Sequence, residues 1–197
     1  MEFDMHQVET HVMEKDLSVV YTIDPCVVED YINTEEHLLA RDKYKVVSID
    51  LQYVGGHPGI DQKVDVARLC VRYHVLIYHY CLATKPCDHF ASFLNSPNDN
   101  VWGSTKKDSL VELTSAIIDP YYKNMKKDAK KNPASWHKAW MWRLDEAHLK
   151  FAAKNVYTCY EMHMRIVNMR ECLLPIIDEG SSHQQRSGGK RHKKMIK

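Results

Sequence analysis

The sequence lacks any long apolar run. None of its apolar stretches approaches the roughly 20 residues that a transmembrane helix needs. The first 16 residues mix acidic and basic side chains without an apolar core, which is typical of neither a signal peptide nor a transit peptide. With 197 residues, 44% hydrophobic and 27% charged, we expect one soluble domain in the cytoplasm, the nucleus or both.

The six cysteines show no C-x-x-C pair and no regular spacing. In a compartment that keeps thiols reduced, they are expected to act as small buried apolar residues. A zinc site that joins Cys87 and His89 to distant ligands remains an alternative. It lacks the regular spacing of structural zinc sites.

The net charge of the chain is small, but its charged residues are unevenly distributed. The chain carries a formal charge of +1, and six of its 27 basic residues lie after position 185, which leaves 21 basic against 26 acidic residues before it. An acidic body does not predict a dedicated nucleic-acid surface, because non-specific binding depends on neutralising phosphates. The residues from 180 onward are polar, basic and rich in serine and glycine, and we expect them to be disordered.

The apolar patterns alternate between strands and helices. Asp24 and Pro25 form an N-cap and first-turn pair that predicts a helix start, and Asp145 predicts another. We expect Ser96 to Lys107 to be a polar loop. The predicted strands are Leu17–Ile23, Tyr44–Leu51, Val64–Arg72 and Val75–Tyr80, and the predicted helices run from Pro25 to Ala40, from Pro86 to about Asn95, and from Asp145 to about Leu174. This order indicates an α/β mixed sheet.

Four stretches of the sequence resemble the motifs of one protein family, and they follow one another in the same order as those motifs. They are Val46–Gln52, Val66–Val71 followed by Val75–Tyr78, Ser109–Leu113 and Phe151–Glu161. Together they resemble DEDD-superfamily 3′–5′ exonuclease domains of the plant Werner-syndrome-like type. The resemblance implies a ribonuclease H-like mixed sheet flanked by helices over residues 16–175. Residues 1–15 would be an N-terminal extension, and residues 176–197 a basic disordered tail.

The resemblance also implies where the catalytic side chains should stand. Such enzymes hold two Mg²⁺ or Mn²⁺ ions with four carboxylates. Here Asp50 stands at the first aspartate, but Gln52 replaces the glutamate, Asn155 replaces the last aspartate, and Phe151 replaces a tyrosine. Both amides keep an acceptor oxygen and lose the charge.

The sequence leaves too little room for the second motif. The family places a strand and a helix before Ser109, and only residues 95–108 are available. We therefore expect this segment to be deleted and part of the usual sheet to be missing. Asp108 or Glu112 could replace the lost acid, or both could belong to the cap of the following helix.

The charge count predicts an inactive relative. One carboxylate in place of four leaves two close divalent cations with little compensation for their repulsion. Asp50 would bind a metal weakly at best, and we expect no cofactor. Since a missing strand would leave an uncovered sheet edge, the first hypothesis is a protein that acts by binding a partner protein or further copies of itself.

Two other functions remain open. One is RNA or single-stranded DNA binding without cleavage along a lysine strip at helical spacing, next to Tyr121 and Tyr122. The strip consists of Lys123, Lys126, Lys127, Lys130 and Lys131. It could equally be a solvated helix face with Asp128 as a partner. The other function is a weak metal-dependent 3′–5′ exonuclease with recruited ligands.

Overall fold

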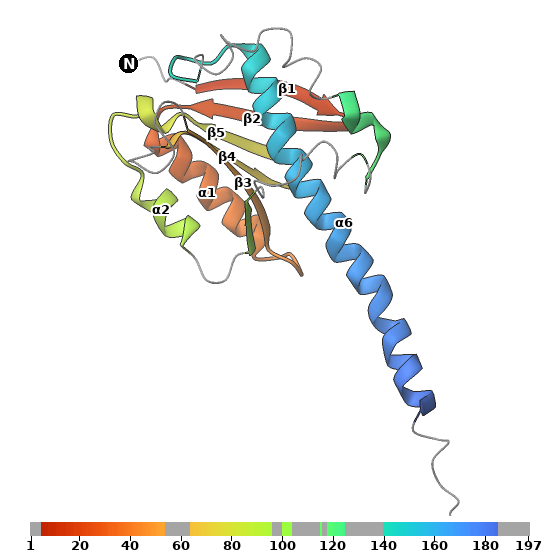
Figure 1. The fold of residues 1–197 in the computed structure, drawn as a ribbon. Coiled ribbons are helices and arrows are strands. Elements are labelled where there is room, and N and C mark those ends of the chain that lie inside the picture. Colours follow the sequence, from red (N-terminus) through yellow and green to blue (C-terminus); the bar gives the residue numbers. More distant parts are fainter. Residues whose placement is uncertain are drawn as a thin grey trace, which may run out of the picture.

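A computed structural model describes residues 5–53, 64–95, 100–103, 115, 118–124 and 140–184. These residues form a sheet with helices on both faces (Figure 1). The strands are β1 (Met5–Val12), β2 (Lys15–Thr22), β3 (Val46–Tyr53), β4 (Val64–Val71), β5 (His74–Tyr78) and β6 (Asn100–Gly103). The helices are α1 (Pro25–Leu39), α2 (Asp88–Leu94), α6 (Glu146–Gln184) and two 3₁₀ helices, η1 (Tyr80–Leu82) and η2 (Pro120–Asn124).

The six strands form one mixed sheet in the order β1-β2-β5-β4-β3-β6. β2 runs parallel to β5 and β3 parallel to β6, whereas β1–β2, β3–β4 and β4–β5 are antiparallel. Because successive side chains of a strand point to opposite faces, each strand serves two cores. Val66 and Cys70 of β4 belong to the core under α6, and Ala67 and Leu69 to the core under α1 and α2.

Helix α1 begins where the sequence predicts. Pro25 is its first residue, and an Asp24 carboxylate oxygen accepts a hydrogen bond of 2.9 Å from the backbone N–H of Cys26. The cap therefore satisfies one of the N–H groups that the first helical turn leaves unpaired. The helix ends at Leu39, one residue before the predicted end.

Strands β4 and β5 are joined by a tight antiparallel hairpin. Its two-residue turn consists of Arg72 and Tyr73, one position earlier than Tyr73 and His74, the two residues that lie between the strands predicted from the sequence. Arg72 has a φ of 54°, in the left-handed region that tight hairpin turns require. The turn sets the register between β4 and β5, and thereby the face on which each β4 side chain lies.

Two strands lie where no strand is predicted from the sequence. Met5–Val12, assigned to an N-terminal extension, pairs with β2 over its whole length as edge strand β1, so the domain begins within the extension. Asn100–Gly103, expected to be loop, pairs with Val46–Ile49 as β6. The described part of segment 95–108 therefore contains a strand, and the expectation that this strand is missing was wrong.

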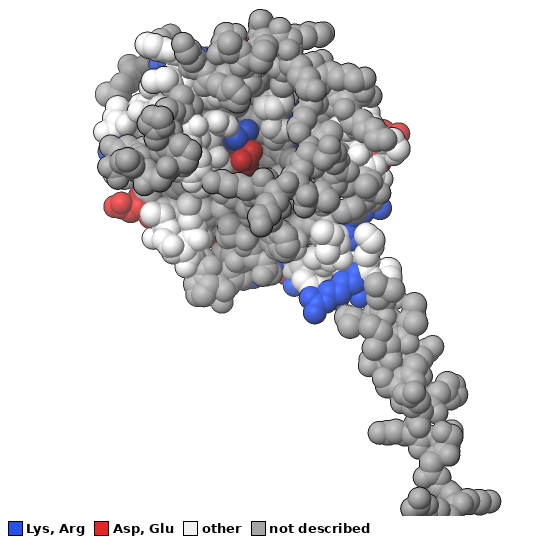
Figure 2. Space-filling view, in the orientation of Figure 1, with Lys and Arg blue, Asp and Glu red and all other residues white. Residues whose placement is uncertain are grey.

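Helix α6 continues to Gln184, whereas the sequence predicted an end at Leu174 before Pro175. A proline inside a helix removes one backbone hydrogen bond, and here the helix continues beyond it. The C-terminal part of α6 extends away from the sheet (Figure 1). Basic side chains gather where α6 leaves the body (Figure 2); Arg165 and Arg170 are exposed in this part of the helix. No described helix is both long and apolar enough to cross a bilayer.

The cysteines divide equally between core and surface. Cys70, Cys87 and Cys159 are buried, as expected, whereas Cys26, Cys81 and Cys172 are exposed. Among the described residues, no group of three or more histidine, cysteine, aspartate or glutamate side chains could hold a metal ion. The alternative of a zinc site at Cys87 and His89 therefore gains no support from the described part of the chain.

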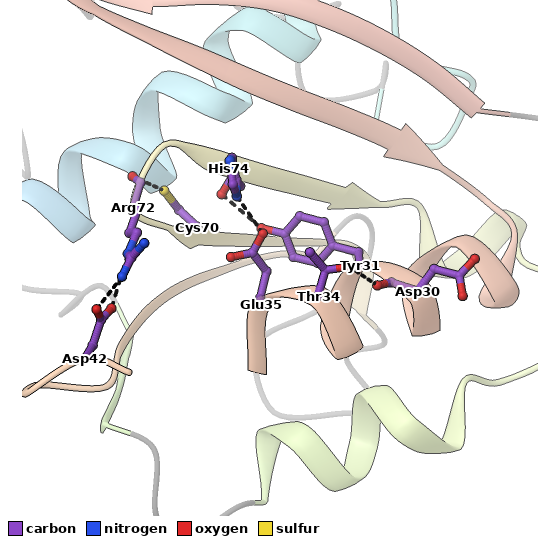
Figure 3. A network of polar contacts seen from close by, with 8 residues as sticks. All are labelled: Asp30, Tyr31, Thr34, Glu35, Asp42, Cys70, Arg72 and His74. Carbon is purple, nitrogen blue, oxygen red and sulfur yellow. Dashed lines mark hydrogen bonds and ion pairs between the residues drawn. The ribbon is translucent and has the colours of Figure 1, made fainter. Parts of the chain in front are cut away.

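A polar network joins α1 to the β4–β5 hairpin (Figure 3). A carboxylate oxygen of Glu35 lies 2.7 Å from Nδ1 of His74, and the Tyr31 hydroxyl donates to the backbone carbonyl of His74 at 2.9 Å. The Glu35 side chain is only 3% exposed, and its second oxygen has no hydrogen-bond partner among the described residues. Burial raises the pKa of Glu35, while His74 and Arg72 oppose this rise.

Replacing Glu35 with glutamine is expected to stabilise the protein at alkaline pH. The folded state binds the Glu35 proton more tightly than the unfolded chain, so this contribution to stability is lost as pH rises through the folded-state pKa. Glutamine keeps an acceptor for His74 and stays uncharged at every pH. Thermal unfolding should show a Tm about 2–4 °C higher at pH 8, the shift that about 1 kcal/mol produces. The gain should shrink toward pH 4; a constant gain would contradict the assignment.

Candidate functional site

The first predicted site residue, Asp50, faces an arginine. Asp50 in β3 and Arg68 in β4 are direct partners in the antiparallel register. An Arg68 Nη2 atom lies 2.9 Å from Asp50 Oδ2; the Arg68 side chain is 3% exposed and that of Asp50 is 23% exposed. The one carboxylate that the exonuclease pattern retains is therefore bound to a buried guanidinium.

Arg68 makes two further contacts in this site. Its Nη2 donates to the Gln52 amide oxygen at 3.3 Å, and its guanidinium lies 5.2 Å from the ring centroid of Trp140. Burial lowers the pKa of Arg68, while Asp50 opposes this change. Because arginine starts so far above neutral pH, the guanidinium stays protonated. Arg68 thus connects both predicted motif residues of β3.

Trp140 is fixed to the sheet by a buried histidine. His79, immediately after β5, donates from Nε2 to the carbonyl of Trp140 at 2.9 Å, so its Nδ1 accepts from the Tyr21 hydroxyl at 2.9 Å. Both rings are buried, and burial lowers the pKa of His79. A neutral His79 in the Nε2–H form satisfies both partners. The residues before α6 are thereby held over Arg68.

The other two predicted positions, Phe151 and Asn155, lie one helical turn apart on α6 and are both half-buried. Glu171 of the same helix contacts Lys43 and Tyr44, just before β3, so α6 runs antiparallel to β3. Asn155 therefore lies toward the strand end that carries Asp50 and Gln52.

The α6 side of the site is largely apolar. Phe151 packs against the core under α6. One turn after Asn155, burial raises the pKa of Cys159 to about 12; Asp50 adds to this rise, and Ser48 opposes it. The Cys159 thiol is therefore protonated and contributes no anionic ligand at neutral pH.

The described site does not fit two divalent cations. Gln52 and Asn155 are neutral amides, and the charges of Asp50 and Arg68 cancel. Mg²⁺ and Mn²⁺ sites depend on anionic oxygens. A guanidinium bound to one oxygen of the remaining carboxylate also repels an incoming cation.

No candidate for the acid of the second motif lies among the described residues. The direction of β6 nevertheless shows at which end of the sheet the segment with the candidates begins. β6 is parallel to β3, and Gly103 at its end is paired with Ile49. The chain therefore leaves β6 at the same end of the sheet as Asp50. The candidate acids Asp108 and Glu112 follow along the sequence, in a segment that lies outside the described residues.

The predicted lysine strip is largely outside the described residues. Lys126, Lys127, Lys130 and Lys131 fall there, and Lys123 lies in η2 with only its backbone described. Of the two neighbouring tyrosines, Tyr121 is 43% exposed, but Tyr122 is fully buried and its hydroxyl contacts Glu161. Only Tyr121 could stack on a base.

Sequence reasoning missed Arg68, Trp140 and His79 as parts of this site. A signal was present for Arg68: it is the single charged residue within the apolar run Val66–Val71, where an unpaired charge would be costly. Its partner could not be chosen from the sequence, because the pairing depends on the register between β3 and β4.

Comparison with known proteins gives the fold. No protein-family model and no curated protein sequence matches this chain. Among solved structures, it is similar to the Aedes aegypti Nibbler EXO domain, with 10% sequence identity, a TM-score of 0.51, and 85% of this chain and 94% of that chain covered. An alignment with the EXD2 exonuclease domain has 12% identity and covers 81% of this chain and 94% of that chain. Its TM-score of 0.26 is too low to show a shared fold.

The fold is therefore that of a 3′–5′ exonuclease domain, an α/β arrangement in which helices flank a mixed sheet. This confirms the fold class that the sequence predicted. At 10% identity the likeness extends to the fold alone.

Proposed function

We propose that this chain is a catalytically inactive relative of 3′–5′ exonucleases, of the plant Werner-syndrome-like type, that acts by binding protein. The observation that carries the proposal is the buried ion pair between Arg68 and Asp50. Arg68 is held against Asp50, which stands where active 3′–5′ exonucleases have their first metal-binding carboxylate. Its guanidinium provides the positive charge that metal ions provide in those enzymes. The fold then needs no cofactor to neutralise this site.

The proposal predicts no cleavage. Labelled single-stranded RNA or DNA incubated with the protein and Mn²⁺ should keep its full length, and the Asp50→Ala variant should be indistinguishable from the natural chain. A competent exonuclease assayed in parallel shows that the substrate can be degraded. Shortening by the natural chain that disappears in Asp50→Ala would overturn the proposal and favour the weak-exonuclease alternative.

Exposed apolar residues near the site support protein binding. Trp142 is 72% exposed and Met141 is 51% exposed, directly after the buried Trp140. Tryptophan is enriched at the centres of protein interfaces, where its burial contributes strongly to affinity. We infer that this segment contacts a partner protein or a second copy of the chain.

Two measurements distinguish a protein-binding function from a nucleic-acid-binding function. Light scattering reports the oligomeric state, and retention on single-stranded RNA reports nucleic-acid affinity. We expect a defined oligomer that Trp142→Ala weakens, without salt-dependent retention on single-stranded RNA. A monomer that retains RNA, and loses it when Lys123, Lys127 and Lys130 are replaced by glutamate, would instead establish a nucleic-acid-binding protein.

A further inference from the structure

A large hollow opens on the face of the sheet opposite the Asp50 site. It holds about 800 Å³ and lies between the sheet, η1 and α2. Its apolar lining comes mainly from Leu51, Val64, Ala67, Phe90, Ala91 and Leu94. Leu51 directly follows Asp50 in β3, and Ala67 directly precedes Arg68 in β4, so both lie on the other face of the pleated sheet. The hollow is therefore separate from the Asp50 site.

The hollow exists because a small residue lies between two large ones. The strand registers place Ala67 opposite Leu51 on one side and Tyr78 on the other. A methyl group in the middle of this row leaves the space that a larger side chain would fill. Helix α2 bounds it with Phe90, which packs edge-on against Tyr78 with the ring centroids 5.6 Å apart.

The charges around the hollow have one sign. Asp65 and Asp88 line it, and no lysine or arginine belongs to its described lining. Asp65 lies on the same strand face as Ala67, and Asp88 begins α2. Asp65 contributes, after burial, to raising the pKa of the neighbouring Cys81 thiol, so the negative potential reaches into the hollow.

Two aromatic rings share the hollow with the acids. Tyr80 and Phe90 belong to its lining, together with Asp65 and Asp88. Tyr78, the cross-strand partner of Ala67, is fully buried and does not belong to the lining. Its ring packs edge-on against Phe90 and against Tyr80, with the Tyr80 centroid 5.7 Å away, and so supports both lining rings.

We propose that this hollow binds an apolar cation, a ligand with an aromatic or aliphatic body and a protonated amine. The apolar lining buries the body, the two aspartates attract the ammonium group, and the aromatic rings favour it through their electron-rich faces. A carboxylate ligand would meet repulsion from both aspartates. This site goes beyond the proposed function, because it uses neither the Asp50 face nor the exposed tryptophan.

The test compares three ligands of nearly equal shape on the full-length protein. Titration calorimetry should show that phenethylammonium binds about tenfold more tightly than phenethyl alcohol, with hydrocinnamate weaker than both. The double variant Asp65→Asn/Asp88→Asn should remove the preference for the ammonium. Asp42→Asn, which removes an acid elsewhere, should leave the preference unchanged.

A further variant tests the shape of the site. Ala67→Leu should fill the hollow and abolish binding of the ammonium and the alcohol alike, with a cooperative thermal transition as the check of folding. Equal binding of all three ligands, no saturable binding, or full binding by a folded Ala67→Leu protein would each overturn the proposal. None of these results bears on whether the Asp50 site is active.

Discussion

Replacing Asp50 with asparagine is expected to lower the free energy of unfolding by about 2–3 kcal/mol. The change leaves the Arg68 guanidinium buried opposite a neutral amide. Arg68 is 3% exposed and cannot reach water without rearranging β4. Breaking a buried ion pair by removing one partner costs more than the pair itself contributes, because the remaining charge stays desolvated.

The direction of this effect distinguishes two kinds of site. In a metal-binding cluster of carboxylates, removing one acid relieves repulsion in the metal-free protein, and stability should rise. In the described part of the Asp50 site, one acid balances one arginine, and stability should fall. Urea unfolding followed by circular dichroism measures the difference directly.

A matched control is available in two connections next to the sheet, between α1 and β3 and between β4 and β5. Asp42 is also bound to an arginine, Arg72, but that pair is more open, with side chains 25% and 38% exposed. Asp42→Asn should cost no more than about 1 kcal/mol, as is usual for exposed pairs. If the two variants lost equal stability, the buried ion pair at Asp50 would not have the role assigned to it.

Replacing Trp140 with alanine is expected to cost about 3–5 kcal/mol of stability. Trp140 is 2% exposed, its ring lies over the Arg68 guanidinium, and it packs edge-on against His148 with the centroids 5.7 Å apart. The variant would leave a cavity and would open a path for water to the ion pair. Chemical unfolding of the variant measures the loss.

Trp142 provides the control for that variant. It is the same residue type two positions further along, but it is 72% exposed. Trp142→Ala should change the stability of the isolated chain by about 0.5 kcal/mol or less. Similar losses for the two tryptophans would contradict the packing described here.

The elements that the sequence predicted well have local signals. Asp24 and Pro25 mark the start of α1, and Asp145 caps α6 by accepting a 2.9 Å hydrogen bond from the His148 backbone. The apolar strands and the hairpin turn likewise depend on neighbouring residues. Such features can be read without knowing the rest of the fold.

The features that were missed depend on distant contacts. β1 turns Val8, Thr10 and Val12 toward the core and leaves Glu9 and His11 exposed, as an edge strand with one solvent-exposed face does, and it is ordered by pairing with β2. β6 is only four residues long and owes its strand form to β3. The Arg68–Asp50 pair requires the register of β3 against β4. In each case the deciding partner lies elsewhere in the chain.

The parallel pairing of β2 with β5 has a consequence for how the chain folds. Ser18 lies beside His74, so this contact closes a loop of more than fifty residues, whereas β3, β4 and β5 connect as successive antiparallel neighbours. Loop closure costs more entropy as the separation grows, and such pairings slow folding. The β3–β4–β5 meander can therefore nucleate first, with the β1–β2 hairpin docking onto β5 late. During synthesis, the ribosome delivers this first hairpin well before its docking edge exists.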